Sequence, residues 1–306
     1  MTLEDIITLM KSHPYILEMG AGKLSKRFKT SRETIYTAKE IVRGKGPVNE
    51  KPRILLFDLE TAPLKGYFWR IWKENISFDA ILADWFLLGY SCKWLGEDKI
   101  YSNILTPNEI SLEYDFRLIN ELWEFLDEAD IVIGHNSKRF DTPRIKTRFL
   151  VHDLPPTSYY QQIDTLEIAK KEFSFTSNKL DSLAKFLGFG KKLQHDMELW
   201  MNVMKGSKED IIRMKKYNEQ DVILLEKIYL KLRPFIKSHP NHNLYNNNVS
   251  EICPTCGSNH LEQDGHYYTQ SGKYETFRCL NCGAISRKRK TVLNKEKNIL
   301  LSIPGR

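Results

Sequence analysis

The chain has 306 residues and a formal net charge of +7, and 41% of its residues are hydrophobic. No apolar run approaches the roughly 18 residues needed to cross a bilayer, which excludes a helical membrane protein. No early stretch has the charged, apolar and small-residue order of a signal peptide. We therefore expect a cytoplasmic globular protein of about two domains.

The positive charge is concentrated in two segments. Residues 1–52 hold ten Lys and Arg against six Asp and Glu, and residues 284–306 hold seven against one. The chain between them is close to neutral. Basic segments beside a neutral core favour a polyanionic partner, and nucleic acid above all, although basic tails also serve only to increase solubility.

Residues 1–46 are rich in helix signals. The stretches LEDIITLMKS, GAGKLSKRF and SRETIYTAKEIVRGK predict three helices, and Ser31 is a good N-cap for the third. A helix, a short turn and a capped basic helix resemble a helix-turn-helix module, whose last helix enters the major groove of DNA. The alternative is an ordinary three-helix accessory domain. The following stretch, GKGPVNEKP over residues 44–52, reads as a linker.

Residues 53–236 mix strands and helices. RILLFDLE predicts a strand, and WFLLGYSCKWLG and DKIYSNIL predict a hairpin of two more. A helix, the buried strand ADIVIGH and the helix DTPRIKTRFLVHD follow. YYQQIDTLEIA predicts a strand that leads into a helix, and the chain from Lys179 onward is helical. This order implies an α/β fold with a mixed sheet flanked by helices.

Two carboxylates in the first of these strands are unusual for a buried position. Asp58 and Glu60 are two residues apart, so they point to the same face of the strand. Removing ions from water costs several kcal/mol each, roughly, and neighbouring like charges repel unless a cation lies between them. We therefore expect other carboxylates and a metal to meet them, and Asp141 and Asp221 are the candidates.

Three motifs carry a resemblance to a known family. DLET contains Asp58 and Glu60, HNSKRFD ends in Asp141, and YNEQD places Tyr217 four residues before Asp221. In this order and context they resemble the DEDD superfamily of 3′→5′ exonucleases, which includes polymerase proofreading domains and ribonuclease D. The resemblance covers residues 53–236 and implies a ribonuclease-H-like fold. Lys216 stands where the histidine branch would need His, so the tyrosine branch is implied.

The resemblance also implies a site with two Mg²⁺ or Mn²⁺ ions, which suit oxygen-rich ligand sets. Asp58 would bridge both ions, Glu60 and Asp221 would hold the ion beside the attacking water, and Asp141 would hold the second. Tyr217 would orient the water, because an ordinary Tyr pKa near 10 makes it a poor base at neutral pH. Asp141 has a second reading as a helix N-cap.

Further side chains near these motifs are weaker candidates. Asp164 and Asp196 read as helix caps or as supports of the site. His135, Asn136 and Phe140 either shape the substrate channel or hold the turn before Asp141. The family places the segment after the first motif near the terminal nucleotides, where Tyr67, Phe68 or Trp69 would stack on an unpaired base. Core packing is the more common use of such aromatic side chains.

Four of the five cysteines form two CxxCG pairs: Cys253 and Cys256, then Cys279 and Cys282. Two such knuckles give a closed tetrahedral zinc site, and the alternating stretch between them predicts a hairpin, as in a zinc ribbon over residues 250–290. The zinc would be structural, since about 40 residues hardly fold alone. Disulfides are the alternative. Cys92 reads as a buried core thiol.

The polar, Asn-rich segment from Ser238 to Ser250 reads as a second linker, and residues 291–306 as a basic tail. The tail and ribbon would bind phosphates, or the ribbon would instead dock a protein partner.

These features together predict a metal-dependent 3′→5′ exonuclease, acting on single-stranded DNA or frayed 3′ ends. The preference for DNA rests mainly on the helix-turn-helix reading. A ribonuclease D-like exoribonuclease is the first alternative. A non-catalytic DNA-binding regulator and a structure-selective endonuclease or transposase are the others.

Overall fold

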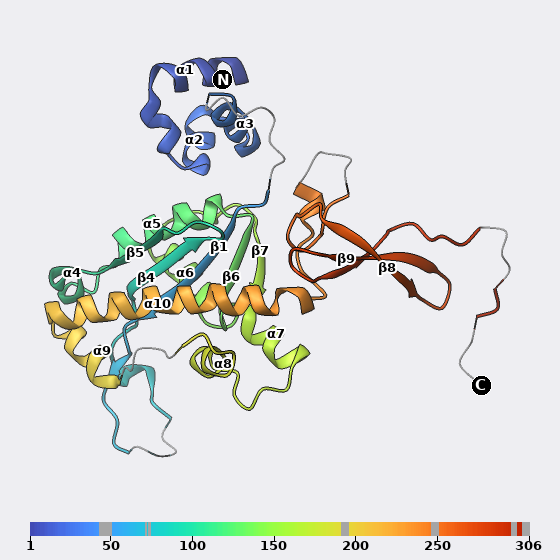
Figure 1. Ribbon diagram of the computed structural model, residues 1–306. Helices are drawn as coiled ribbons and strands as arrows, with labels where there is room; N and C mark the ends of the chain where they lie inside the picture. The colour runs from blue at the N-terminus through green and yellow to red at the C-terminus, as the bar shows by residue number, and fades with distance from the viewer. Residues whose placement is uncertain are drawn as a thin grey trace. The chain divides into compact units, whose positions relative to one another are not determined.

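The computed structural model describes residues 1–42, 51–70, 72, 75–190, 196–245, 251–294 and 299–301 (Figure 1). Met1–Val48 and Arg53–Tyr229 form one compact unit, and Asn49–Pro52 and Leu230–Arg306 form a second. The predicted end of the helical module, most of the first linker and parts of the second linker and the tail lie outside the described residues. Within the described residues, every helix is too short or too polar to span a bilayer.

The first unit begins with a small helical module that has its own core. It consists of α1 (Leu3–Ser12), the 3₁₀ turn η1 (Pro14–Glu18), α2 (Ala21–Phe28) and α3 (Arg32–Val42). Thr2 and Asp5 form a capping box on α1. Ser31 Oγ accepts the Thr34 N–H at 3.0 Å, which confirms Ser31 as the cap of α3. The buried side chains of this core are Ile6, Met10, Ile16, Ala21, Leu24, Phe28, Ile35 and Ala38.

A five-stranded mixed sheet forms the centre of the first unit, in the order β5-β4-β1-β6-β7. Its strands are β1 (Ile54–Thr61), β4 (Leu87–Trp94), β5 (Ile100–Ile104), β6 (Ile131–Gly134) and β7 (Gln161–Asp164). β4 pairs antiparallel with β5, which is the predicted hairpin. β1 pairs antiparallel with β4 and parallel with β6, so the sheet is mixed as predicted. A separate two-stranded sheet joins β2 (Lys65–Gly66) to β3 (Ile81–Ala83), with the 3₁₀ turn η2 (Phe78–Ala80) before β3.

Helices cover the five-stranded sheet. They are α4 (Pro107–Ser111), α5 (Phe116–Glu128), α6 (Asp141–Val151), α7 (Thr165–Glu172), α8 (Leu180–Phe186), α9 (Met197–Met204) and α10 (Lys208–Leu232), followed by the 3₁₀ turn η3 (Arg233–Phe235). Leu55, Phe57 and Leu59 of β1 belong to the same buried cluster as the apolar residues of α5 and α6. The alternate side chains of β1 point to the opposite face. In Figure 1, the long helix α10 runs across the strands of this sheet.

The helical module packs on α5 within the first unit. Lys26 Nζ lies 3.6 Å from the centre of the Trp123 ring, and Lys23 pairs with Glu124 at 3.3 Å. Gly22 approaches α5 so closely that a Cβ there would lie 2.1 Å from Asp127 Oδ2. Two basic residues of α2, Lys23 and Lys26, therefore contact an acidic and an aromatic side chain of α5.

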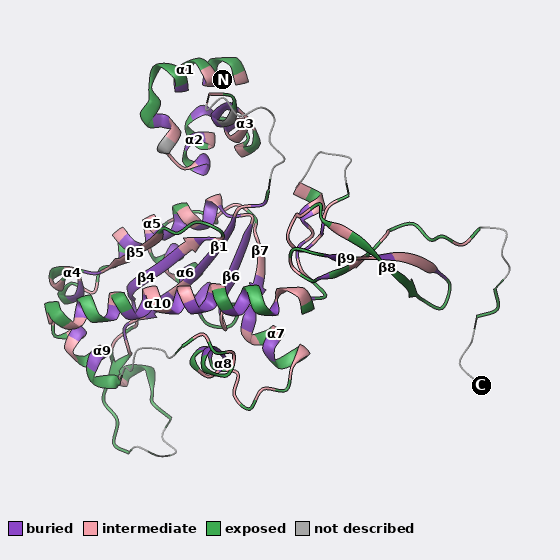
Figure 2. Ribbon diagram, viewed as in Figure 1, coloured by how far each residue is buried: buried purple, intermediate pink, exposed green. Residues whose placement is uncertain are grey.

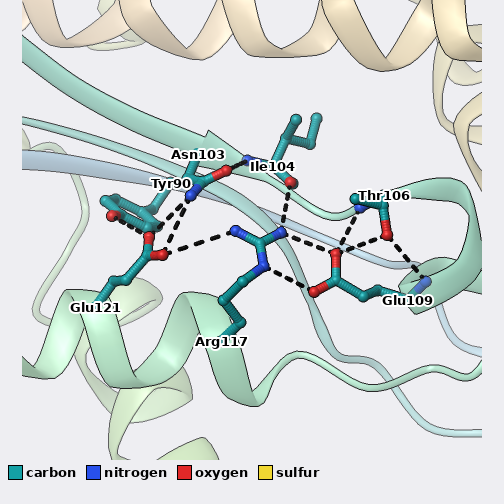
Figure 3. A network of polar contacts seen from close by, with 7 residues as sticks. All are labelled: Tyr90, Asn103, Ile104, Thr106, Glu109, Arg117 and Glu121. Atoms are coloured by element: carbon teal, nitrogen blue, oxygen red, sulfur yellow. Dashed lines mark hydrogen bonds and ion pairs between the residues drawn. The ribbon is translucent and has the colours of Figure 1, made fainter.

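A polar network joins α4 and α5 to the edge of the sheet (Figure 3). Arg117 donates through Nε and Nη2 to the two carboxylate oxygens of Glu109, each at 2.8 Å, and through Nη2 to the Ile104 carbonyl at 3.1 Å. Thr106 is the N-cap of α4, and its backbone N–H donates to the same Glu109 carboxylate at 2.8 Å. These contacts hold the pKa of Glu109 down to about 2, chiefly because of Arg117.

The second unit contains the predicted ribbon. Its three-stranded sheet has the order β10-β9-β8, formed by β8 (Leu261–Tyr268), β9 (Lys273–Cys279) and β10 (Ile285–Arg287). Part of the segment expected to be a linker is ordered as the 3₁₀ turn η4 (His242–Tyr245). His242 is 6% exposed there, and its backbone N–H donates to the Pro254 carbonyl at 2.8 Å. This part of the chain packs against the first cysteine pair, which its polar composition did not reveal.

Candidate active site

Strand β1 presents Asp58 and Glu60 toward α10. Asp58 lies opposite Ser91 of β4, and Glu60 lies opposite Gly89. Glu60 is 7% exposed, and Asp58 is half-buried. The strand periodicity thus places both carboxylates on one face, as predicted, while Leu59 between them packs into the hydrophobic core.

Helix α10 brings the third motif to the same face. Tyr217, Asn218 and Asp221 are buried on the side of the helix that meets the sheet. Two contacts hold α10 in place: Ser102 of β5 donates to Glu219, and Lys93 of β4 pairs with Glu226. Residues three and four apart share a helix face, so the YNEQD spacing turns Tyr217 and Asp221 together toward β1.

Asp58, Glu60 and Asp221 converge from two elements that are far apart in the sequence. Carboxylate oxygens of these three residues lie within 4.8 Å of one another. Three carboxylates this close, two of them buried, repel one another strongly without a cation. Their all-oxygen donor set fits a hard divalent ion such as Mg²⁺ or Mn²⁺. The residues present therefore fit the metal that the resemblance implies.

Tyr217 lies against this cluster. Its hydroxyl is hydrogen-bonded to the Asp221 side chain. Burial raises the pKa of Tyr217, and the negative charges of Asp221, Glu60 and Asp58 raise it further. The raised pKa favours the protonated phenol, which is the form expected to orient a water by hydrogen bonding.

Asn218 is a member of the site that the sequence reasoning did not single out. Its Nδ2 donates to Asp58 Oδ2 at 2.7 Å, and the residue is 2% exposed. This hydrogen bond fixes the rotation of the Asp58 carboxylate. Helix periodicity in YNEQD places Asn218 on the same face as Asp221, three residues later. The residue type gave no reason to select it, because an Asn in a helix does not by itself indicate a metal site.

Asp141 is the first residue of α6 and is 4% exposed. The backbone N–H groups of Asp141 itself and of Leu59 in β1 lower the pKa of this carboxylate. Burial is the larger effect and raises the pKa of Asp141 to about 7. Within the described residues the 4.8 Å cluster does not include Asp141. The N-cap of α6 is Phe140, so the reading of Asp141 as a cap is wrong.

The turn before Asp141 is held by hydrogen bonds. His135 contacts Thr165 Oγ1 through Nδ1 at 2.9 Å and the Asn178 carbonyl through Nε2 at 3.0 Å. Asn136 has a positive φ of 65°, and its N–H donates to Asp164 Oδ1 at 2.9 Å. These contacts give His135 and Asn136 a structural role. Their part in substrate binding stays a prediction.

Asp164 and Asp196 are helix caps, one of the two uses expected of them. Asp164 Oδ1 accepts the Leu166 N–H at 2.9 Å at the start of α7, besides the bond from Asn136. Asp196 Oδ1 accepts the Leu199 N–H at 3.2 Å at the start of α9. Asp164 is 2% exposed, and its charge also contributes to the raised pKa of Asp141.

The aromatic segment after the first motif is exposed rather than packed in a core. The exposed fractions are 72% for Tyr67, 60% for Phe68 and 95% for Trp69. Trp72 and Phe78 are similarly exposed, at 82% and 91%. The expectation of core packing is therefore wrong for these side chains, because the short β2–β3 ribbon leaves them without a second layer to pack against.

A pocket of about 620 Å³ opens at the end of β1. Its lining residues are Thr61, Ala62, Pro63, Leu64, Trp85, Arg144, Asp196, Met197 and Trp200. Thr61 follows Glu60 directly in the chain, and the Trp200 ring lies 6.2 Å from the Tyr217 ring. The pocket is therefore linked to the site residues through Thr61, the neighbour of Glu60 in β1, and through Trp200, the neighbour of Tyr217.

Arg144 connects the pocket to the second motif. It lies one helical turn after Asp141, and it donates to Thr61 Oγ1. Its guanidinium stacks 3.7 Å from the centre of the Phe140 ring and 5.1 Å from that of Trp85. Phe140 thus positions Arg144. Neither Arg144 nor the two tryptophans Trp85 and Trp200 was predicted, because only the tertiary fold brings them together in one pocket.

The four cysteines of the ribbon form a second candidate metal site. Their sulfur atoms lie within 4.8 Å of one another, with Cys253 and Cys282 at 3.7 Å and Cys256 and Cys279 at 3.6 Å. The thiols are free, so the disulfide alternative does not describe this structure. Gly257 and Gly283 have φ of +72° and +78°, as the tight CxxCG turns require. Four thiolates at this spacing fit one tetrahedral zinc ion.

Comparison with known families supports this reading of the first unit. Residues 96–233 match the family model described as the RNase H superfamily. The matched segment includes Asp141, Tyr217 and Asp221, and it begins after Asp58 and Glu60. The mixed sheet flanked by helices is the predicted ribonuclease-H-like fold, so the fold prediction is confirmed. Nucleases of this kind use divalent metals, and the match supports nuclease activity on a nucleic acid.

Comparison with solved structures gives a more distant likeness. The family B DNA polymerase from the hyperthermophilic archaeon Pyrobaculum calidifontis aligns with a TM-score of 0.45 and 15% sequence identity. The alignment covers 62% of this chain and 26% of the polymerase chain. No curated protein matches the sequence.

Proposed function

We propose that this protein is a metal-dependent 3′→5′ exonuclease that hydrolyses the phosphodiester bonds of DNA at single-stranded or frayed ends. The observation that carries the proposal is the convergence of Asp58, Glu60 and Asp221 within 4.8 Å, with the Tyr217 hydroxyl bonded to Asp221. A non-catalytic regulator would have no use for three clustered carboxylates, whose repulsion lowers stability unless a metal binds.

The side chains divide the chemistry among them. Asp58, Glu60 and Asp221 would hold one divalent ion, and Asp58 with Asp141 a second. Such ions neutralise the scissile phosphate and activate water for attack. Tyr217, protonated beside Asp221, would donate or accept a hydrogen bond that orients the water. Asn218 would keep the Asp58 oxygens in a fixed orientation.

The neighbouring pocket is suited to the terminal nucleotide. Trp85 and Trp200 offer aromatic surfaces for a base, and Arg144 offers a guanidinium for a phosphate. Because Thr61 lines the pocket directly after Glu60, a nucleotide bound there would present its phosphodiester to the carboxylates. This arrangement favours cleavage at an end of the strand.

The preference for DNA rests on the N-terminal helices. α2 and α3 are joined by a turn of three residues, Lys29 to Ser31, as in a helix-turn-helix module. Ribonuclease D-like cleavage of RNA is the alternative that the same site supports. The proposal also includes one structural zinc ion in the ribbon and a cytoplasmic location, where thiols stay reduced.

The test is cleavage of single-stranded DNA and RNA oligonucleotides labelled at the 5′ end, with Mg²⁺ or Mn²⁺. A 3′→5′ exonuclease shortens them stepwise and leaves a ladder of labelled products. The Asp58→Asn variant should lose this activity by a factor of at least about 10³, while Asp98→Asn, which changes an exposed turn carboxylate, should not.

Each outcome has a distinct meaning. A ladder from RNA alone would replace the DNA preference with the exoribonuclease alternative. Internal cuts from the first time points would indicate an endonuclease. If neither polymer is cut under any metal condition, or if Asp58→Asn cuts as fast as the unaltered protein, the proposed function is wrong.

A further inference from the structure

The β8–β9 hairpin of the ribbon extends beyond the cysteine cluster as an exposed arm. Every residue of β8 from Glu262 to Tyr268 is exposed, although the strand is paired along one edge with β9. Figure 2 shows the contrast with the buried central strands of the first unit. The side chains of β8 from Glu262 to Tyr268 are therefore accessible to a partner.

One face of this arm carries two tyrosines and an arginine in contact. Tyr267 and Tyr274 are directly opposite each other on β8 and β9, so they lie on the same face. Arg287 of β10 places its guanidinium 4.3 Å from the centre of the Tyr274 ring and 5.4 Å from that of Tyr267. Tyr267 is nevertheless 49% exposed. We refer to Tyr267, Tyr274 and Arg287 as the tyrosine–arginine face.

The opposite face differs in charge. It carries Tyr268, which is 65% exposed, and Lys273 at 5.8 Å from the Tyr268 ring. It also carries Glu275, the neighbour of Lys273 on that side of β9, which pairs with Lys288 at 3.0 Å. Both faces therefore present an exposed tyrosine near the β8–β9 turn. The face of Tyr268 also has a carboxylate there, Glu275, and the tyrosine–arginine face does not.

The arm and the strand after it have an excess of positive charge. Residues 261–290 contain six Lys and Arg against three acidic residues, Glu262, Asp264 and Glu275. Arg278 pairs with Asp264 at 2.8 Å, and Lys288 with Glu275 and Glu251. Within the described ranges, the ion pairs do not include Arg287, Arg289 or Lys290. These cations lie on and directly after β10, so the charge is complementary to a polyanion.

We propose that the tyrosine–arginine face binds single-stranded nucleic acid. Exposed aromatic rings stack on unpaired bases of any sequence, and neighbouring cations contact the phosphates. Duplex bases are already stacked on one another, so the tyrosines have no role toward a duplex. The ribbon then holds a strand on the same chain that carries the nuclease site and raises the local concentration of substrate.

The binding itself does not depend on the proposed function, so the test uses binding and not cleavage. Full-length protein carrying Asp58→Asn is titrated into a labelled single strand of about 16 nucleotides, without added Mg²⁺, and fluorescence anisotropy is measured. Tyr267→Ala and Arg287→Ala should each weaken binding about 5- to 100-fold. Arg287→Ala should also lower the dependence of binding on salt by about one phosphate contact.

Tyr268→Ala is the matched control, because it removes a tyrosine from the adjacent position on the other face. It should change the affinity less than about 2-fold. Zinc content of one ion per chain in each variant shows that the ribbon has folded. Equal losses for Tyr267→Ala and Tyr268→Ala would overturn the assignment of the face, and so would unchanged affinity in Tyr267→Ala and Arg287→Ala.

Two further outcomes separate the proposals. An equal loss of affinity for a duplex of the same length would overturn the single-strand assignment. If the protein cuts no substrate but Tyr267→Ala still weakens binding selectively, the proposed function fails and the binding face stands. If the protein cleaves as proposed but Tyr267→Ala binds normally, the proposed function stands and the binding face is wrong.

Discussion

At the scale of single residues, the acidic cluster depends on groups that carry no charge. Asn218 is almost completely buried and donates to Asp58 at 2.7 Å. A carboxylate that holds a metal ion needs such an outer contact to keep its oxygens in place. The neutral amide supplies the contact without adding to the repulsion among Asp58, Glu60 and Asp221.

This role predicts the behaviour of Asn218→Ala. The variant should bind Mn²⁺ about 10- to 100-fold more weakly, because the Asp58 carboxylate is free to rotate. Isothermal titration calorimetry measures the affinity without reference to cleavage. Asn120→Ala on α5 is the control and should leave Mn²⁺ binding unchanged. Unaltered Mn²⁺ affinity in a folded Asn218→Ala protein would contradict the role.

At the scale of secondary-structure elements, two contacts decide how helices attach to their neighbours. Glu109 joins the start of α4 to α5 through Thr106 and Arg117 (Figure 3). Gly22 joins α2 to α5 by allowing the backbone to approach Asp127. The Glu109 contact is electrostatic and the Gly22 contact is steric, so different experiments test them.

The Glu109 contact predicts a pH dependence. Its folded pKa of about 2 is below the ordinary value of 4.5, so its stabilising effect is complete above about pH 5 and is lost as the pH falls toward 2. Glu109→Gln should therefore lower the free energy of unfolding by about 1–3 kcal/mol at pH 7. Urea unfolding at several pH values measures the difference between variant and unaltered protein, which should shrink between pH 4.5 and pH 2. A difference that stays constant with pH would show that Glu109 acts by shape alone.

The Gly22 contact predicts a change of sign in a double mutant. Gly22→Ala should destabilise the first unit by about 1–3 kcal/mol, because the new methyl would overlap Asp127 Oδ2, and Asp127 is held by Ser158. In an Asp127→Ala background the same change should be neutral or stabilising, since Ala favours a helix over Gly. Thermal unfolding of the four proteins measures both effects. Destabilisation that persists without the Asp127 carboxylate would exclude the steric explanation.

At the scale of the whole molecule, the chain divides into two compact units with different sources of stability. The first unit buries a large hydrophobic core around the sheet. Among the described residues of the ribbon, the buried cluster consists of Cys253, Cys279 and Ala284, with a few partly buried neighbours. We therefore expect the ribbon to depend on a metal for the stability that its small core does not supply.

Removal of zinc should affect one unit only. A chelator should release about one zinc ion per chain and abolish the folding of the ribbon, because the free energy of metal binding that stabilises the folded ribbon is then lost. Calorimetry should show that the unfolding transition of the first unit is retained. Cys279→Ser should have the same effect without a chelator. Loss of both transitions together would show that the two units do not unfold independently.

The sequence by itself determined most of the elements and the candidate ligands. Strand periodicity placed Asp58 and Glu60 on one face, helix periodicity joined Tyr217 to Asp221, and two CxxCG turns gave four metal ligands. These signals are local: each depends on backbone geometry over a few residues. The capping signals of Ser31 and Asp164 are local for the same reason.

Only the tertiary structure decided which distant groups meet. The hydrogen bond from Asn218 to Asp58 joins residues 160 positions apart, and Trp85, Arg144 and Trp200 form one pocket from three separate segments. The exposure of Tyr67 and Trp69 also contradicts their apolar character, because burial depends on whether another layer of the fold covers a residue. Sequence periodicity specifies the face of an element on which a side chain lies, whereas packing between elements specifies what that face contacts.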